Sequence, residues 1–122
     1  MEGKRKRGIG MILRGELYTA SLDPVVGSEQ GGARPVLIVQ NDVGNRFSPT
    51  VVALAVTSQI QKARLPTHVR IDAGESGLSS DSVILAEQIR TLDKRRLQKR
   101  IGKIAPATLE KVEDAMRVSL GL

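Results

Sequence analysis

Short apolar runs separated by polar, glycine-rich segments predict five or six β-strands before the last part of the chain. Residues 12–22 alternate loosely between apolar and polar, and residues 35–39 (PVLIV) form a continuous apolar run. The run at 50–57 (TVVALAVT) is the richest in β-branched residues and predicts the central strand. The other predicted elements are strands at 67–72 and 82–86, and loops or turns at 27–32, 41–49 and 72–80.

The spacing of apolar positions changes near the C-terminus to three and four residues, which is typical of an amphipathic helix. Pro106 suits the first turn of that helix and Gly121 its end. Residues 93–99 predict a short basic helix. The apolar face of the C-terminal helix consists of Leu109, Val112, Met116 and Leu120. Together the elements predict one mostly β, α+β domain at 12–122, an antiparallel barrel with a C-terminal amphipathic helix.

The composition excludes several kinds of site. The 122 residues include no Cys, which excludes disulfides and cysteine nucleophiles and suits a reducing, cytoplasmic compartment. The single His excludes a site with two imidazole ligands, and the chain has no P-loop and no Asp-x-Asp pair. We therefore expect no metal and no cofactor. No apolar run approaches the ~18–20 residues of a membrane span, so no membrane association is expected.

The net charge of +6 is unevenly distributed. Residues 1–14 hold five basic residues against one acidic residue, whereas the other 108 residues hold fourteen against twelve. We interpret residues 1–11 as a basic, disordered leader outside the folded domain. A second basic run at 90–103 holds seven basic residues against Asp93. Each run has two interpretations: it is only solvated, or it attracts a polyanion such as nucleic acid.

The candidate chemistry lies where the glycine-rich loop at 27–32 meets the strand at 35–39 through Arg34. Backbone N–H groups of such a loop and a guanidinium both suit a phosphate, although a plain hairpin loop with an exposed Arg fits equally well. Thr57 ends the central strand and places a hydroxyl there, or only reflects β-propensity. His68 is either a general base or a structural or solvent-exposed residue.

One way to break a phosphodiester suits a chain without Cys and with one His. An RNA 2′-hydroxyl attacks its own phosphorus while the protein aligns it and neutralises the developing charge. This chemistry needs a guanidinium, a hydroxyl or amide donor and a proton acceptor. The sequence holds all three types, but their spacing alone does not assemble them.

Several blocks in the same order resemble the MazF/PemK family of toxin–antitoxin endoribonucleases, nearest to its chromosomal Gram-positive branch. The likeness spans residues 12–121. Its blocks are 15–18 (GELY), 22–41 (LDPVVGSEQGGARPVLIVQN), 45–50 (NRFSPT), Thr57, 62–69 (KARLPTHV) and 81–94 (DSVILAEQIRTLDK).

The resemblance implies a small SH3-like antiparallel barrel with a C-terminal helix that works as a homodimer. It implies cleavage of single-stranded RNA, chiefly mRNA, without a metal, at a U-A-C-A-U-like site, giving a 2′,3′-cyclic phosphate and a 5′-hydroxyl. It also implies a MazE-like antitoxin partner whose acidic C-terminal tail lies across the RNA groove.

By position, the resemblance implies that Arg34 and Thr57 are catalytic. The PemK-like branch has a His at the position of Ser28 and an Arg-x-Asp pair in place of residues 85–87, so its proton-transfer roles do not carry over intact. Glu87 keeps the acidic character of that pair and is the hypothetical second-rank general base. The residues implied to bind RNA are Ser28, Glu29, Gln30, Gly31, Gly32, Leu65, Pro66, Thr67 and Gln88.

Two other functions remain open from the sequence. One is a CcdB-like toxin that binds gyrase, which shares this barrel but uses a terminal Trp that this chain lacks. The other is an RNA-binding domain without catalysis.

Overall fold

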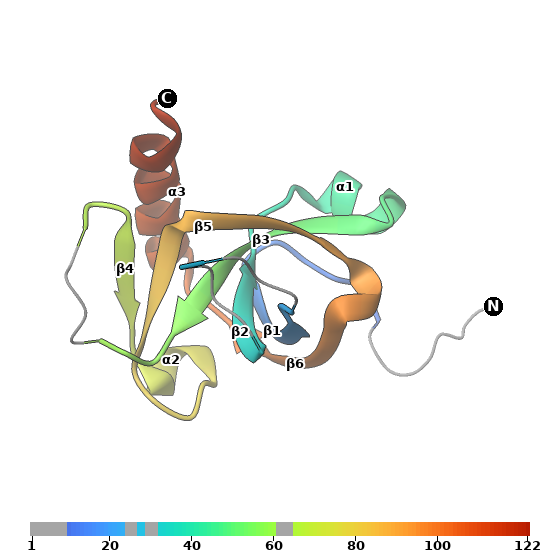
Figure 1. Ribbon diagram of the computed structural model, residues 1–122, viewed down its shortest axis with the longest axis horizontal. Helices are drawn as coiled ribbons and strands as arrows, with labels where there is room; N and C mark the ends of the chain where they lie inside the picture. The colour runs from blue at the N-terminus through green and yellow to red at the C-terminus, as the bar shows by residue number, and fades with distance from the viewer. Residues whose placement is uncertain (1–9, 24–26, 29–31, 61–64) are drawn as a thin grey trace.

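One antiparallel sheet dominates the computed structural model, which describes residues 10–23, 27–28, 32–60 and 65–122. Within these residues six strands follow the order β4-β5-β3-β2-β1-β6 (Figure 1). Their bounds are β1 Glu16–Ser21, β2 Ala33–Ile38, β3 Thr50–Thr57, β4 His68–Ile71, β5 Ser82–Asp93 and β6 Leu97–Lys103. The predicted mostly β class is confirmed. The described order is open, with β4 and β6 at its two ends.

Apolar side chains cover both faces of the sheet, which explains the continuous apolar runs of its inner strands. Leu17, Leu37 and Leu54 belong to one cluster, against which α3 (Pro106–Leu120) packs. Tyr18 and Val36, one position away on the same strands, belong to a second cluster. Because side chains alternate along a strand, β1 and β2 contribute to both clusters.

The segment 41–49, predicted as a loop, contains the six-residue helix α1 (Asp42–Phe47). The Asn41 side chain accepts the Gly44 N–H at 2.8 Å, and Asn45 Nδ2 donates to Gln40 O at 2.9 Å. These side-chain bonds stabilise a helix whose composition of Asn, Asp and Gly disfavours it. The predicted turn at 72–80 likewise contains a single helical turn, α2 (Ala73–Ser76).

The basic helix predicted at 93–99 is wrong. Only residues Lys94–Arg96 form a single 3₁₀ turn, η1, and Leu97 begins strand β6. β6 pairs with β1 and most of its side chains are exposed or half-buried, so its polar sequence is that of an edge strand. The strand predicted at 82–86 is too short. The strand β5 continues beyond its apolar run through a half-buried polar stretch to Asp93.

The predicted C-terminal helix is confirmed as α3. Pro106 opens it, and Gly121 follows it with a left-handed φ of 71°. Its N-cap residue, Ala105, has no capping side chain. Glu75 of α2 fills that role, because its Oε2 accepts the Ala105 N–H at 3.1 Å and the Thr108 hydroxyl at 2.5 Å. Within the described part of the chain, no helix combines the length and apolar character needed to cross a membrane.

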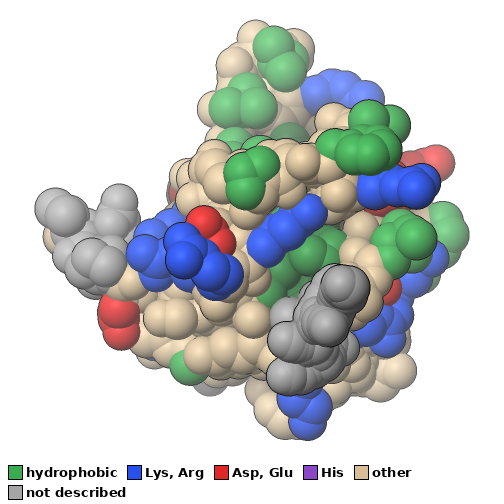
Figure 2. Space-filling view, turned by 90° about the vertical axis from the view of Figure 1, so that its right-hand side faces the viewer, with side chains coloured by type: hydrophobic (Ala, Val, Ile, Leu, Met, Phe, Trp, Pro, Cys, Tyr) green, Lys and Arg blue, Asp and Glu red, His purple; other side chains and the backbone are tan. Residues whose placement is uncertain are grey.

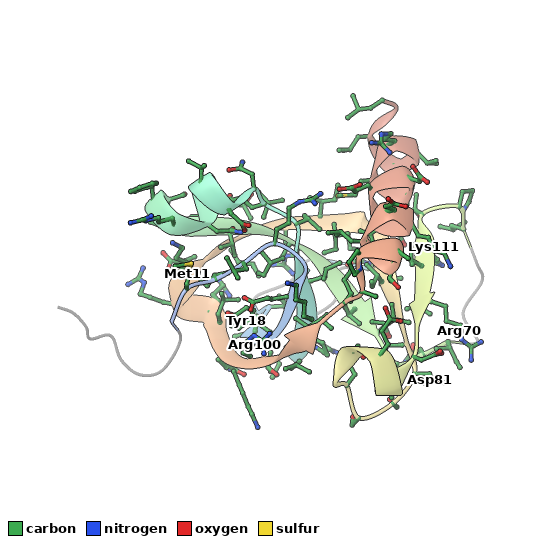
Figure 3. The ribbon with its side chains drawn as sticks, turned by 180° about the vertical axis from the view of Figure 1, so that it is seen from behind. Met11, Tyr18, Arg70, Asp81, Arg100 and Lys111 are labelled. Carbon is green, nitrogen blue, oxygen red and sulfur yellow. The ribbon has the colours of Figure 1, made fainter. Side chains whose placement is uncertain are left out.

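A buried carboxylate joins β1 to β6 on the side of the molecule seen in Figure 3, where Tyr18 and Arg100 lie together. Glu16 accepts hydrogen bonds from the Leu13 N–H at 2.8 Å, the Tyr18 hydroxyl at 3.1 Å and Arg100 Nε at 2.7 Å. Burial, and then the Glu16 charge, raise the pKa of Tyr18 well above its ordinary value. This cluster is paired throughout and belongs to the scaffold.

Candidate functional site: a groove between a loop and a bend in strand β5

A groove of about 510 Å³ opens between the loop that carries Ser28 and the middle of β5. Gln88 Nε2 lies 3.4 Å from Ser28 O, which joins two segments 60 residues apart. Three of the residues predicted to act on RNA therefore lie together here. The lining residues are Ser28, Glu87, Gln88, Ile89, Arg90 and Thr91.

A bulge in β5 forms one wall of this groove. Leu54 of β3 pairs with Ile89, and its neighbour Ala55 pairs with Leu85, so residues 86–88 stand outside the register. The Ala86 N–H donates instead to Thr67 O at 2.9 Å. Bulges redirect side chains, and this one turns Glu87 and Gln88 toward the groove.

Glu87 is held by two side chains that precede or begin β4. Its Oε1 accepts the Thr67 hydroxyl at 2.8 Å, and its Oε2 lies 2.9 Å from His68 Nε2. Burial raises the pKa of Glu87, but the hydrogen bonds from His68 and Thr67 outweigh it, so the pKa lies below its ordinary value. Glu87 is therefore a carboxylate at neutral pH and a weaker proton acceptor than an ordinary one.

His68 uses both ring nitrogens within the protein, because its Nδ1 accepts the Leu65 N–H at 3.2 Å. This favours the structural interpretation over a general base. Leu65 and Pro66 are exposed beside it, while Thr67 is buried.

Arg34 and Thr57 lie at the same end of neighbouring strands. β2 and β3 pair antiparallel through Val36 and Ala55, which brings the start of β2 beside the end of β3. Arg34 is half-buried, and the buried Thr57 accepts the Gln59 N–H on its hydroxyl oxygen at 3.2 Å. Since an accepted bond leaves the O–H proton available, Thr57 retains a donor.

The loop at 27–32 is closed at its base. The Asp23 carboxylate accepts the Gly32 N–H at 2.9 Å, and the Leu22 N–H donates to Gly32 O at the same distance. Gly27 and Gly32 have φ values of 60° and 74°, which favour glycine. Ser28 and Gly32 are described, whereas the predicted site residues Glu29, Gln30 and Gly31 lie outside the described residues.

Two arginines that sequence reasoning left unassigned anchor the entrance to this loop. Arg90 donates to Leu22 O at 3.2 Å, and Arg96 donates to Ser21 O at 3.1 Å and to Asp23 O. They belong to the basic run at 90–103, whose first half lies where β5 passes through η1 into β6. Figure 2 shows Lys and Arg side chains on that side beside exposed hydrophobic ones. Only the charge run signalled these arginines, and it did not indicate their backbone partners.

No group of three or more His, Cys, Asp or Glu residues able to hold a metal ion occurs in the described ranges. The side chains that the groove brings together are carboxylate, amide, hydroxyl and guanidinium groups. Such groups read the polar edges of bases and neutralise phosphates.

Comparison with known proteins reveals close relatives. Residues 13–120 match the family of PemK-like, MazF-like toxins of type II toxin–antitoxin systems. The chain is 58% identical over 112 residues to "Endoribonuclease EndoA" of Bacillus subtilis (strain 168), covering 92% of this chain and 97% of the relative.

Solved structures of similar fold include two MazF-type proteins. MazF (Form-I) from Deinococcus radiodurans has a TM-score of 0.80 at 27% identity, over 93% of this chain and 100% of that one. A mycobacterial endoribonuclease in complex with its cognate antitoxin has a TM-score of 0.76 at 33% identity, over 91% and 96%.

Proposed function

The chain belongs to the PemK-like, MazF-like toxin family of type II toxin–antitoxin systems and is an endoribonuclease, and from that premise we propose how it acts. It cuts single-stranded RNA, chiefly mRNA, without a metal ion, at a U-A-C-A-U-like site. The observation that carries the proposal is the groove in which the Ser28 loop meets Glu87 and Gln88.

The proposed reaction is an internal transfer within RNA. The 2′-oxygen next to the scissile phosphate loses its proton to an acceptor and attacks phosphorus. The bond from phosphorus to the 5′-oxygen breaks, and that oxygen takes a proton. The products are a 2′,3′-cyclic phosphate and a 5′-hydroxyl, so the scissile strand must be RNA.

Arg34 is proposed to stabilise the negative charge on the phosphate and the leaving 5′-oxygen. A guanidinium offers a planar fork of donors that matches phosphate oxygens. Thr57 is proposed to hold the scissile phosphate through its hydroxyl. Their position at one end of β2 and β3 supports a shared task.

Glu87 is proposed chiefly to contact RNA bases from the groove wall. Its role as the acceptor of the 2′-hydroxyl proton is proposed as the second of two roles. Its lowered pKa supports this ranking, because a carboxylate with a lower pKa is a weaker base and removes the proton of a hydroxyl less efficiently. Carboxylates accept hydrogen bonds from exocyclic amines of bases. The other residues proposed to bind RNA are Ser28, Glu29, Gln30, Gly31, Gly32, Leu65, Pro66, Thr67 and Gln88.

The proposed assembly is a homodimer, inhibited by a MazE-like antitoxin whose acidic C-terminal tail occupies the groove. The similar mycobacterial endoribonuclease, solved in complex with its cognate antitoxin, supports a partner of this kind. An acidic tail fits a groove whose wall includes Arg90.

The test is cleavage of a synthetic single-stranded RNA that contains U-A-C-A-U, in EDTA, by the wild type and by Arg34→Ala. We expect cleavage by the wild type and a loss of ~10²–10³-fold in the variant, which is typical for one charge-stabilising donor. Arg95→Ala is the matched control, because Arg95 is exposed and bonded to Asp93. RNA retention without cleavage would indicate a binding domain instead, and Arg34→Ala activity within a few-fold of wild type would remove Arg34 from catalysis.

A further inference from the structure

His68, the only histidine in the chain, does not line the groove but is bonded to Glu87, which does, and nothing in the proposed chemistry uses it. Its side chain is only 11% exposed and opens β4. It contacts the segment before it through Leu65 and the β5 bulge through Glu87. These two segments supply the exposed Leu65 and Pro66, together with Glu87 and Gln88.

The contacts of His68 select one tautomer. The Leu65 N–H is a donor, so Nδ1 must be unprotonated to accept it at 3.2 Å. Nε2 then carries the proton of the neutral ring and donates to Glu87 Oε2 at 2.9 Å. The His68 N–H donates back to Leu65 O at 2.9 Å, which closes the turn that contains Pro66 and Thr67.

The same carboxylate also accepts the Thr67 hydroxyl, so Glu87 is restrained from two sides. Without the bond from His68, the Glu87 carboxylate would lose a side-chain restraint on Oε2 and keep the one from Thr67 on Oε1. The Leu65 turn would at the same time lose its side-chain acceptor. The position of the Glu87 carboxylate in the groove wall and the arrangement of the neighbouring Leu65–Thr67 turn therefore both depend on one imidazole.

We propose that His68 is a positioning residue that sets base selection by holding Glu87 and the Leu65–Thr67 turn in one arrangement. It acts without touching the reacting atoms. This inference rests on the proposed function, because it requires that the groove binds RNA.

Two substitutions separate the halves of the role. In His68→Gln the side-chain amide reaches the position of Nε2 and donates to Glu87. In His68→Asn the amide oxygen lies near the position of Nδ1 and accepts from Leu65, but the side chain is too short for Glu87. Selection is measured as the ratio of kcat/KM for a U-A-C-A-U oligoribonucleotide to that for each single-base variant of it.

We expect His68→Asn to lower the largest of these ratios about tenfold, chiefly by raising KM for the U-A-C-A-U RNA. We expect the same ratio in His68→Gln to stay within about threefold of wild type. A change of about tenfold is consistent with the free energy of one hydrogen bond to a charged group. Equal losses of kcat on every RNA in both variants would indicate a structural or base role and overturn the proposal. So would unchanged selection in His68→Asn. Thermal unfolding of both variants checks that each is folded.

A binding measurement separates this proposal from the proposed function. The same oligonucleotides with 2′-deoxy sugars throughout the pentad cannot be cut, and their Kd values are measured by fluorescence anisotropy. If the wild type binds the pentad selectively but does not cleave the parent RNA, the proposed function is overturned. The role of His68 is still supported in that case if His68→Asn reduces the selectivity of binding. Wild-type protein that neither binds selectively nor cuts would overturn both.

Discussion

At the residue scale, the ionisation of Glu87 links the groove to folding stability. The two hydrogen bonds that lower its pKa stabilise its charged form, so the folded state holds the proton less tightly than the unfolded chain does. Its contribution is fully present above the ordinary carboxyl pKa of 4.5 and is lost as pH falls through the lowered value. Acid should therefore loosen the wall that Glu87 shares with Thr67 and His68.

Replacing the carboxylate by an amide in Glu87→Gln should remove this pH dependence. Between neutral pH and about pH 5 the stability of the variant should differ from that of wild type by a constant amount, and below pH 4.5 the wild type should lose stability faster. Urea unfolding at a series of pH values measures this. Glu110→Gln, on the exposed surface of α3, is the control. Parallel pH curves for wild type and Glu87→Gln would show that the hydrogen bonds do not favour the charged form in solution.

The pH dependence of cleavage by Glu87→Gln addresses its second proposed role. If Glu87 takes the proton of the 2′-hydroxyl, the variant should cleave more slowly than wild type at neutral pH, and the wild-type rate should fall only below pH 4.5. A cleavage rate unchanged at every pH would remove Glu87 from the proton-acceptor role and leave it as a base contact.

At the element scale, the sequence predicts best those elements whose apolar pattern determines them. The run at 50–57 is β3 to the residue, and the period from Pro106 to Leu120 is α3. It predicts worst the elements that tertiary bonds stabilise. β6 follows from its ladder to β1, and α1 from the cap at Asn41 and the bond of Lys94 Nζ to Asn45 O at 2.5 Å. The β1 ladder and the Lys94 contact are not visible in a local window, whereas the Asn41 cap lies three residues from Gly44 and is a local signal that the prediction of a loop at 41–49 overlooked.

The site follows the same division. The family resemblance singles out Arg34, Thr57 and Glu87 as candidates, and the bounds of the apolar runs at 35–39 and 50–57 place the first two at strand ends. The meeting of Ser28 with Gln88 depends on the curvature of β5 at its bulge, and the Glu87–His68 pair depends on the β4–β5 register. Register and curvature arise from long-range packing, so the pattern of one strand does not contain them.

The N-terminus of α3 depends on a side chain from another element. Because Ala105 offers no cap, Glu75 satisfies the Ala105 N–H and the Thr108 hydroxyl from α2. We predict that Glu75→Ala lowers the free energy of unfolding by about 0.5–2 kcal/mol, the range for loss of a capping side chain. Urea unfolding measures this loss. Glu110→Ala is the control, because it also removes one negative charge, from the exposed surface of α3, but no capping hydrogen bond. Equal effects of the two substitutions would show that Glu75 acts only by its charge.

The contact between α2 and β6 leaves no room for a side chain at Gly102. A Cβ there would lie 2.1 Å from Ser76 O, a backbone atom that cannot rotate away. We predict that Gly102→Ala destabilises the protein by about 1–3 kcal/mol, because α2 must move off the edge strand. Gly74→Ala is the control, since a Cβ at Gly74 meets nothing within 4 Å. Thermal unfolding that ranks the two alike would contradict this close approach.

At the scale of the whole molecule, the net charge of +6 has less to do with the groove than its size suggests. Residues 1–12, which precede the family match, hold four basic residues against Glu2 and so contribute three of the six units. Within the remaining chain, Arg90 and Arg96 donate hydrogen bonds to backbone carbonyls of the Ser21–Asp23 segment. If RNA binds in the groove as proposed, we expect it to depend on a few charges beside the groove more than on the net charge of the chain.

Substituting Lys4, Arg5, Lys6 and Arg7 together by Ser tests this division, since it removes four positive charges and leaves the family-matched chain intact. We predict the same cleavage position and a kcat/KM within about threefold of wild type at 0.15 M salt. Each phosphate contact to single-stranded RNA contributes about 0.7 to the slope of log affinity against log salt. If residues 4–7 held RNA, the variant would lose up to about three units of that slope, whereas an enzyme that binds RNA mainly in the groove keeps its slope nearly unchanged. Measuring kcat/KM from 0.05 to 0.3 M salt distinguishes the two, and a collapse of the slope in the variant would assign the RNA contacts to residues 4–7.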